Sequence, residues 1–280
     1  MMIKEVPIIE PLRTRLPKQF HPYVGVVFLG FAFFTPIGLL VWNSLNFQGG
    51  SLLENYRIAL SGVYLNSIYY SFIVASVTTP ITIILAFTIS YYIVFVSSYQ
   101  KILLGLVILP LWIAYIIRYL GIQLFLYPRG PVVSIFGTNF GLLFSTAGVV
   151  IGLTSGFLPF AILPIYNSLN SLDEAILDAS AVMGAGSFET TYRITIPLSL
   201  SGIITAGLIT FILSAGAFLA PDILGGPGNL MIANMIERSY SQIYDIELAA
   251  ALAVIYTSIL TIILLIFDSY INFGKVLSDI

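Results

Sequence analysis

Few side chains in this sequence could do covalent or metal chemistry. There is no cysteine, and the only histidine is His21, so thiolate nucleophiles, disulfides and cysteine-ligated metals are excluded and a histidine metal site is not expected. The sequence also contains no G-x-x-x-x-G-K-[S/T] phosphate loop, the motif by which many proteins cradle the phosphates of ATP. The polar residues that remain are suited to recognition, either of a partner protein or of a small solute.

The most conspicuous group of polar residues is the stretch 178–197, which reads DASAVMGAGSFETTYRITIP. Just before it, Ser171 and Glu174 have the spacing of a capping box, in which each side chain bonds the backbone amide of the other residue. This spacing predicts a helix that begins near Leu172. Gly184 is placed to end that helix, because glycine adopts the left-handed cap conformation at little cost.

A second short helix is predicted after the glycine. Ser187 is a candidate N-cap, Phe188 and Tyr192 would lie one turn apart, and Pro197 would be tolerated in the first turn of the next helix. The segment carries more acidic than basic residues, whereas helices that lie on phospholipid are usually basic. Two interpretations remain open: a projection that fills a groove on another protein, or an ordinary loop packed on its own bundle.

Three residues elsewhere could meet a small cationic solute. Asp222 follows a proline and could pair with a positive charge, while the rings of Trp112 and Tyr115 could stack on a cation or on methylene groups. Each has an ordinary alternative. Asp222 could cap a helix end or face solvent, and the two rings could pack in the bundle or belong to an aromatic belt at the membrane interface.

The elements that position these residues are set by composition. Hydrophobic residues make up 58% of the chain, charged residues make up 9%, and the mean hydropathy is +1.00. Soluble domains carry about 25% charged residues, so this chain is expected to be an integral membrane protein. The net charge of −2 gives no reason to expect a nucleic-acid partner.

Six apolar segments approach the roughly 20 residues that a helix needs to cross a bilayer. The second is long for one crossing, and several contain prolines. Gly148, Gly152 and Gly156 place a small-residue ridge on one face of the fourth segment, where another helix can approach closely. The predicted spans are 24–45, 65–96, 101–121, 142–168, 198–220 and 247–272. We expect an N-terminal segment, 1–23, followed by a six-helix domain, 24–280, with a polar connecting loop, 169–197.

Lysine and arginine positions predict the orientation of these spans. With the N-terminus inside, seven basic residues lie on the inner side and four on the outer side, a bias in the direction of the positive-inside rule. Both termini and the loop 169–197 are therefore predicted to be cytoplasmic. The inner set is Lys4, Arg13, Arg15, Lys18, Lys101, Arg193 and Lys275; the outer set is Arg57, Arg118, Arg129 and Arg238.

The predicted spans lack ionisable residues near their centres. Arg118 is expected near an outer end and Asp268 near an inner end. Ion-coupled transporters usually place such residues at the membrane midplane, and an intramembrane enzyme would need a cluster of acids or a nucleophile with a base. The sequence therefore gives little support to either class.

The polar stretch resembles the cytoplasmic loop of type I ABC importer permeases. That loop has the form E-A-A, three residues, G, nine residues, then I-x-L-P. Here Asp178, Ala179 and Ser180 are followed after three residues by Gly184, and the sequence ITIP begins nine residues later. Both spacings match, and the departures are Asp178 for Glu, Ser180 for Ala and an isoleucine, Ile196, for Leu.

The resemblance implies the type I ABC importer permease fold, with the loop as a coupling helix seated in a cytoplasmic ATPase. No catalytic residue and no cofactor is implied in this chain, because ATP and Mg would bind the ATPase dimer. The other implied partners are a second permease subunit in a heterodimer, an extracytoplasmic solute-binding protein and the lipid of the inner membrane. The coupling residues that it implies are Asp178, Ala179, Ser180, Met183, Gly184, Ala185, Phe188, Ile194 and Pro197.

Two further stretches resemble the spermidine/putrescine branch of this family. They are LPLWIAYIIRYLGI, residues 109–122, and GAFLAPDILGGPGNLMIANMI, residues 216–236. The resemblance implies a polyamine substrate and places Trp112, Tyr115 and Asp222 as candidates for its path. Related branches carry ferric iron, thiamine and other small solutes, so an importer for iron, thiamine, an amino acid or a sugar is the alternative.

Overall fold

The computed structural model describes residues 21–45, 53–138 and 140–271, and every regular element within these ranges is a helix. Four helices are long and apolar enough to cross a membrane, and two bent helix pairs raise the number to six if each pair counts as one span. This agrees with the all-α membrane fold expected from the sequence.

The helices of the first half are α1 (His21–Leu45), α2 (Glu54–Ala59), α3 (Gly62–Tyr91), η1 (Tyr92–Val96), α4 (Gln100–Ile108), η2 (Leu109–Trp112), α5 (Tyr115–Leu126) and α6 (Pro131–Phe136). Those of the second half are α7 (Thr146–Asn170), α8 (Glu174–Val182), α9 (Ser187–Thr190), η3 (Thr191–Thr195), α10 (Ile196–Leu198), α11 (Leu200–Ala215), η4 (Pro221–Gly225), α12 (Ile232–Ser241) and α13 (Ile246–Ile271).

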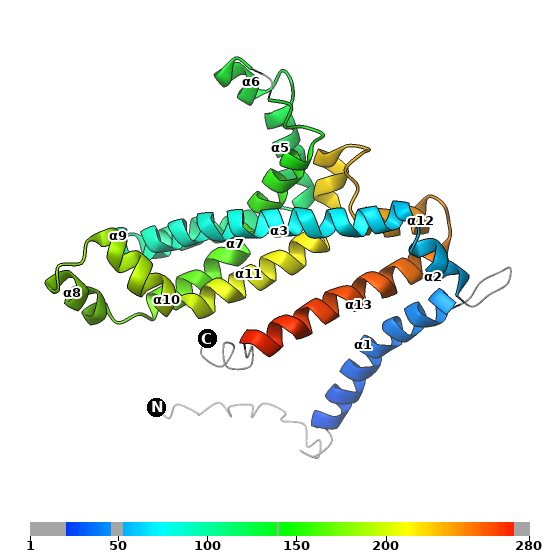
Figure 1. Cartoon of the computed structure of the whole chain (residues 1–280), viewed down its shortest axis with the longest axis horizontal. Helices are drawn as coiled ribbons and strands as arrows, with labels where there is room; N and C mark the ends of the chain where they lie inside the picture. The colour runs from blue at the N-terminus through cyan, green and yellow to red at the C-terminus, as the bar shows by residue number, and fades with distance from the viewer. Residues whose placement is uncertain (1–20, 46–52, 139, 272–280) are drawn as a thin grey trace, which may run out of the picture.

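The bundle is built around α3, α7 and α11, which pack against one another (Figure 1). Small residues allow the close approach: a Cβ on Gly202 of α11 would lie 2.6 Å from the Pro164 carbonyl oxygen of α7. Several hydroxyl groups on α3 bond back to carbonyls of the same helix, as Ser71 does to Ser67 at 2.8 Å, which satisfies them without water. Helices α1 and α13 pair beside this core, and α2 and α12 lie at one end of it (Figure 1).

The glycine ridge predicted on the fourth span is confirmed. A Cβ on Gly148 would collide with the carbonyl oxygen of Leu142, and one on Gly152 would collide with the side chain of Leu224. A Cβ on Gly156 would lie 2.7 Å from the hydroxyl of Tyr119. The ridge on α7 therefore receives α5 and η4, two elements that are distant from each other in the sequence.

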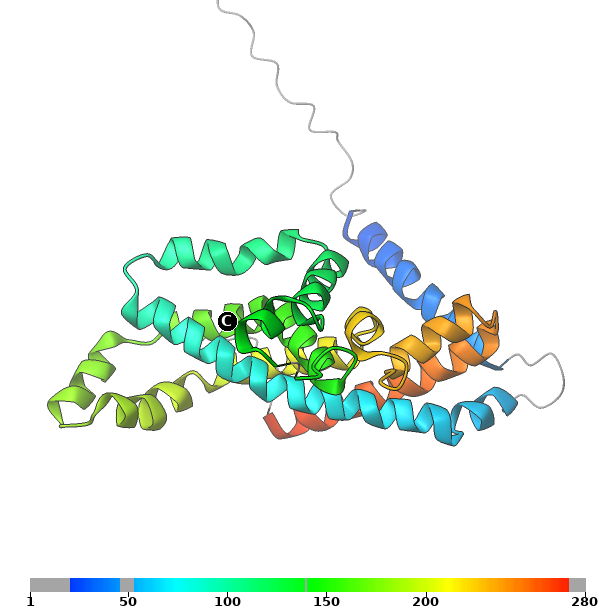
Figure 2. The same cartoon turned by 90° about the horizontal axis from the view of Figure 1, so that it is seen from above.

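The prediction of one continuous third span, 101–121, is wrong. The helix breaks between Trp112 and Tyr115, and the two parts meet at 97°. Pro110 has no amide hydrogen to continue the α-helical pattern, and the chain passes through the 3-10 turn η2 into extended backbone at Ile113 (ψ 127°) and Ala114 (ψ 138°). Helix α4 then runs along the edge of the bundle while α5 turns inward (Figure 2).

The fifth span, predicted at 198–220, is also interrupted. The segments Ser187–Leu198 and Leu200–Ala215 meet at 70°, and α11 ends at Ala215 because Gly216 caps it.

The fourth span begins four residues later than predicted, since the Ser145 hydroxyl accepts a bond from the Gly148 amide and starts α7 at Thr146.

The first, second and sixth spans lie close to their predicted bounds, as α1, α3 with η1, and α13. The predicted inner-side charges Lys4, Arg13, Arg15, Lys18 and Lys275 lie outside the described residues.

Candidate functional site

The polar stretch forms a helical projection at the end of the bundle opposite α2 and α12 (Figure 1). Helix α8 ends at Val182, and Gly184 follows with φ +86°. The amide of Met183 bonds to the Ala179 carbonyl at 3.1 Å, and that of Ala185 bonds to the Ser180 carbonyl at 3.1 Å. The left-handed glycine that ends this helix is thus confirmed.

Both serine caps predicted for this projection are wrong. The Ser171 hydroxyl donates to the Ser168 carbonyl at 2.8 Å, and it is the Asp173 carboxylate that accepts the Ala175 amide at 2.9 Å. Helix α8 consequently begins at Glu174 instead of Leu172.

At the second short helix the N-cap residue is Gly186. Its backbone is extended, and no side chain caps the helix at this position. Ser187 is therefore the first residue of α9, and its carbonyl accepts a bond from the Thr191 hydroxyl at 2.9 Å. In both places a residue within two positions of the predicted serine precedes the helix instead: Asp173, two residues after Ser171, and Gly186, one residue before Ser187.

Hydroxyl contacts hold the projection together and join it to the spans. The Ser180 side chain is buried, its hydroxyl donates to the Leu177 carbonyl at 2.7 Å, and its oxygen lies 3.0 Å from the Thr190 hydroxyl. The Thr191 hydroxyl lies 3.4 Å from the Tyr91 hydroxyl at the end of α3. A displacement of the projection would therefore reach α3 directly as well as α11.

The projection presents large apolar side chains to its surroundings. Met183 is 80% exposed and Phe188 is 85% exposed, and the Phe188 ring stacks on Tyr192 with centroids 6.5 Å apart. Of the other predicted coupling residues, Asp178, Ala179, Gly184 and Pro197 are exposed, Ala185 and Ile194 are half-buried, and Ser180 is buried. Exposed apolar groups on a compact two-helix element are typical of a surface that docks into a groove.

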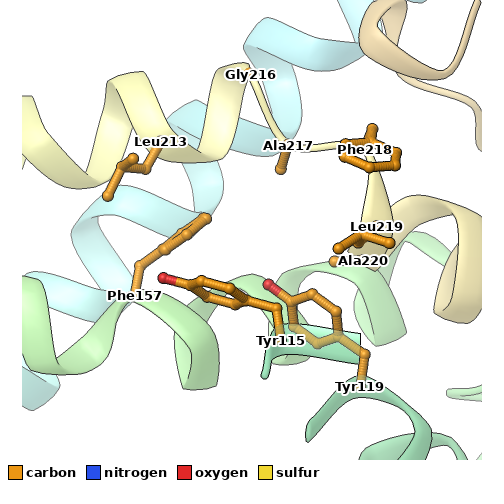
Figure 3. Close-up of a pocket in the computed structure, with 9 residues that line it drawn as sticks. All are labelled: Tyr115, Tyr119, Phe157, Leu213, Gly216, Ala217, Phe218, Leu219 and Ala220. Atoms are coloured by element: carbon orange, nitrogen blue, oxygen red, sulfur yellow. The ribbon is translucent and has the colours of Figure 1, made fainter. Parts of the chain in front are cut away.

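The second candidate site is a cavity of about 210 Å³ beside the break in the third span. It is lined by α5, by the middle of α7 and by the end of α11 with the segment that follows it (Figure 3). The Tyr115 centroid lies 6.1 Å from that of Tyr119 and 6.1 Å from that of Phe157. The lining residues are Tyr115, Tyr119, Phe157, Leu213, Gly216, Ala217, Phe218, Leu219 and Ala220.

The structure does not bring the three predicted solute contacts together. Tyr115 lines the cavity, whereas Trp112 is 88% exposed and lies outside the cavity lining. Asp222 also lies outside the lining, where its carboxylate is 3.9 Å from the Arg238 guanidinium. A role for Trp112 and Asp222 in the solute path stays a prediction.

Sequence reasoning missed most of the cavity wall. Tyr119 lies four residues after Tyr115, so helical spacing could have placed both rings on one face. Phe157 adjoins Gly156 on the glycine ridge, the place where α5 approaches α7. The segment 216–220 belongs to the stretch 216–236 that resembles the polyamine branch, but its position beside α5 could not be predicted, because that position depends on where α11 ends.

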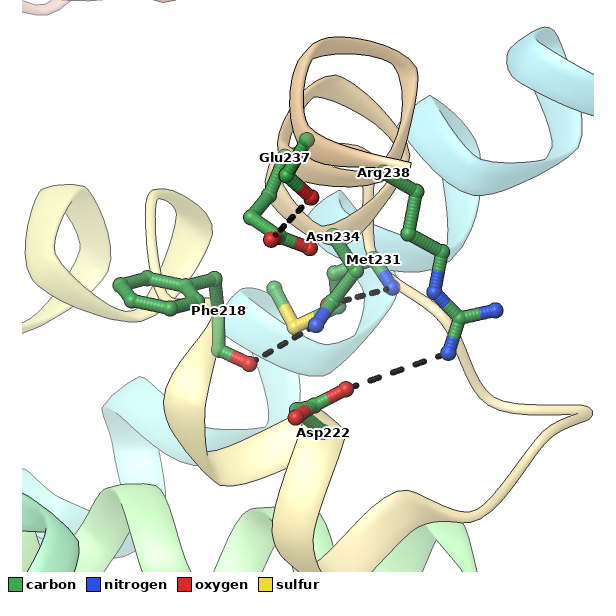
Figure 4. A network of polar contacts seen from close by, with 7 residues as sticks. Phe218, Asp222, Met231, Asn234, Glu237 and Arg238 are labelled. Carbon is green, nitrogen blue, oxygen red and sulfur yellow. Dashed lines mark hydrogen bonds and ion pairs between the residues drawn. The ribbon is translucent and has the colours of Figure 1, made fainter. Parts of the chain in front are cut away.

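Helix α12 holds the outer rim of this cavity in place (Figure 4). The Asn234 amide group donates to the Phe218 carbonyl at 2.8 Å and accepts the Met231 amide at 3.2 Å. The ion pair between Arg238 and Asp222 is a second link to the same segment. The rim is therefore fixed by one buried side chain and one exposed ion pair.

The sequence suggested that Arg118 lies near an outer end of a span. The structure places it beside the middle of α7 instead. The inward turn of α5 places its guanidinium against α7, where Nη1 lies 3.5 Å from the Gly156 carbonyl oxygen. Its Cζ lies 4.2 Å from the centroid of the Tyr115 ring. Over the ranges that the structure describes, no cluster of three acidic or histidine side chains is placed to hold a metal ion.

Comparison with known proteins gives a consistent result. The family described as "Binding-protein-dependent transport system inner membrane component" matches residues 50–274. The chain is 30% identical over 222 residues to the spermidine/putrescine transport system permease protein PotB of Escherichia coli K12, an alignment that covers 77% of this chain and 81% of the relative.

More distant proteins are also similar. The molybdenum transport system permease protein ModB of Azotobacter vinelandii is 27% identical over 157 residues, which cover 54% of this chain and 69% of ModB. A solved bacterial ABC transporter involved in the import of the acidic polysaccharide alginate superposes with a TM-score of 0.75 at 18% identity, covering 90% of this chain and 94% of its own. At that identity the superposition speaks for the fold alone.

Proposed function

Because this chain belongs to the family of binding-protein-dependent transport system inner membrane components, and is thus the permease subunit of an ABC importer, we propose that it carries a polyamine such as spermidine or putrescine. Importers of this family take their solute from a binding protein and hydrolyse ATP on separate subunits. Membership decides against an ion-coupled transporter and against an intramembrane enzyme. The chain accordingly supplies the path for the solute and has no ATPase site of its own.

The aromatic wall of the cavity is the observation that carries the polyamine proposal. Tyr115, Tyr119, Phe157 and Phe218 surround a space of about 210 Å³. A ring face attracts an ammonium group by about 0.5–2 kcal/mol, and its apolar surface suits the methylene groups between the ammonium groups. The similarity to PotB supports the same substrate class.

An importer for another small solute is the second candidate, and the similarity to ModB favours it. That relative is named for molybdenum transport, so members of this family with related sequences differ in what they carry. Iron, thiamine, amino acids and sugars therefore belong in the same uptake assay.

The exposed projection supports a coupling role for the residues 171–194. Its apolar tip, with Met183 and Phe188, would seat in a groove of one cytoplasmic ATPase subunit, and closure of the ATPase dimer would move it. The rigid links from Ser180 to Thr190 and from Thr191 to Tyr91 would pass that motion to the spans. The remaining coupling residues, including Asp178 and Gly184, would fix the shape of the tip.

This assignment sets the expected orientation in the inner membrane. The segment 1–23, both termini and the loop 169–197 would be cytoplasmic, and the end with α2 and α12 would face the binding protein. The domain 24–280 would form the transmembrane unit with a second, different permease subunit. The alternative, a homodimer, would contain two identical cavities.

Uptake by the reconstituted complex tests the substrate. The permease pair, its ATPase and its binding protein are placed in proteoliposomes, and uptake of labelled putrescine and spermidine is measured with and without other solutes. We expect Tyr115→Leu to raise the apparent KM about tenfold, in line with the loss of one cation–π contact and its packing, while Tyr69→Leu on the exposed face of α3 leaves it unchanged. Uptake of another solute that excess polyamine does not inhibit would reject the proposal.

A further inference from the structure

Arg118 is half-buried in the apolar part of the bundle and has no carboxylate partner among the residues that the structure describes. The ion pairs found among the described residues join Arg57 to Glu54, Arg193 to Glu189, and Arg238 to Asp222. Nε and Nη2 of Arg118 are buried and have no hydrogen-bond partner within the described part of the chain. A buried charge that is neither paired nor fully hydrogen-bonded is strongly destabilising, so a functional reason for it is expected.

The depth of this group makes the cost larger. Its acceptor, the Gly156 carbonyl, lies near the middle of α7 (Thr146–Asn170), a helix long and apolar enough to span the membrane. Charged side chains at such depth are rare, and they usually mark a path for a solute or an ion. Arg118 touches the cavity described above through one residue, Tyr115, which it contacts with its guanidinium and which also lines the cavity.

We propose that Arg118 is an internal competitor of the solute for Tyr115, and this rests on the proposed polyamine function. The guanidinium lies 4.2 Å from the Tyr115 ring centroid and is attracted by the negative charge of the ring face. A solute ammonium group that approaches the same ring meets a weakened attraction and a like charge. The solute therefore binds Tyr115 fully only when Arg118 moves away.

The contacts of Arg118 are suited to such a movement. Among the described residues its guanidinium makes one hydrogen bond, to the Gly156 carbonyl, and at 3.5 Å this bond is at the weak limit of such contacts. One residue before Gly156, the Ser155 carbonyl lacks its usual helical donor, because Pro159 has no amide hydrogen. Arg118 thus acts as a specificity-determining residue: a cation must outcompete the guanidinium, and a neutral solute has no charge with which to displace it.

Uptake kinetics of Arg118 variants test this proposal. In proteoliposomes with the complete complex, Arg118→Gln is expected to lower the apparent KM for putrescine about three- to tenfold, the change that corresponds to one cation–π contact. Arg118→Lys, which keeps a cation at the ring, should stay close to wild type. In a Tyr115→Leu background Arg118→Gln should lower the KM much less, since the shared ring is gone and only the repulsion between like charges is removed. Arg129→Gln removes the same charge from an exposed position and serves as the control.

Three results would overturn the proposal. A KM raised by Arg118→Gln would mean that the arginine helps to bind the solute. An unchanged KM with a lower turnover and a lower melting temperature would mean that it only braces α5 on α7. A KM lowered equally by Arg129→Gln would point to general electrostatics. Wild-type complexes that take up no polyamine would reject the proposed function itself, and with it this inference, whereas normal wild-type uptake beside any of these three results rejects the inference alone.

Discussion

Gly184 determines the shape of the projection through its backbone and not through contacts within the described chain. Its φ of +86° is one that side chains other than asparagine and aspartate rarely adopt, and a Cβ built there meets no described atom within 4 Å. Strain of about 1–2 kcal/mol would therefore be the only cost of a side chain within this chain. Any larger effect must come from a partner that occupies the space in front of the glycine.

Three substitutions separate the backbone strain at Gly184 from a clash with a docked partner. Gly184→Val should leave the protein in the membrane but weaken ATPase association and abolish transport, while Gly184→Asn, which tolerates a left-handed backbone, should lose less. Gly186→Ala is the matched control, because Gly186 has φ −73° and open space around it. Asp178→Ala should give a milder loss than Gly184→Val.

The measurements for this series are the ATPase that co-purifies with each variant and the ATP hydrolysis that the solute-loaded binding protein stimulates. Full association and full stimulation in Gly184→Val would mean that the projection is an ordinary loop. Equal losses in Gly184→Val and Gly186→Ala would mean that the turn is sensitive in general and that the left-handed position has no special role.

Ser180 allows a second test at the scale of one residue. Its buried hydroxyl bonds to Leu177 and Thr190, so Ser180→Ala should lower the stability of the projection by about 1 kcal/mol, the usual contribution of one hydrogen bond. ATPase association should survive, since alanine occupies this position in the motif that the sequence resembles. Hydrogen exchange of α8 measures the effect, and exposed Ser187→Ala is the control; unaltered exchange in Ser180→Ala would contradict it.

At the scale of elements, hydropathy predicted the existence of the long helices well and their directions poorly. α1, α3 and α13 follow directly from apolar segments of sufficient length. The bends at Trp112–Tyr115 and at Leu198–Leu200 depend on a few residues, and an average over some twenty residues does not detect them. The aromatic cavity was missed for the same reason, because it exists only after the bend turns α5 across α7.

Helix packing depends on the small residues at the contacts. A Cβ on Gly202 would lie 2.5 Å from the Ser168 Cβ and 2.6 Å from the Pro164 carbonyl oxygen, so Gly202→Ala should force α11 away from α7 at a cost of about 1–3 kcal/mol. Gly105→Ala on α4 meets no atom within 4 Å and should be neutral or slightly stabilising. Thermal unfolding in detergent compares the two, and similar melting temperatures would show that the contact is more adaptable than its distances indicate.

At the scale of the whole molecule, the two candidate sites lie along the same three helices. The projection is at one end of α3, α7 and α11, and α12 holds the cavity rim towards the other end (Figures 1 and 4). Motion at the projection reaches α3 through Tyr91 and α11 through the η3 segment. In the proposed orientation, this arrangement would let a soluble motor on one side act on a cavity that the solute enters from the other side.

This arrangement requires that the two ends lie on opposite sides of the membrane, and the lack of cysteine in the chain allows a direct test. Ser187→Cys in the projection and Gln242→Cys at the end of α12 both lie at exposed positions, so their thiols should react equally fast with a charged maleimide in detergent. In intact cells only Gln242→Cys should react, because a charged reagent does not cross the bilayer, and Ser187→Cys should become reactive once the membrane is opened. Rapid labelling of Ser187→Cys in intact cells would place the projection outside, where it could not meet an ATPase, and the coupling role would have to be abandoned.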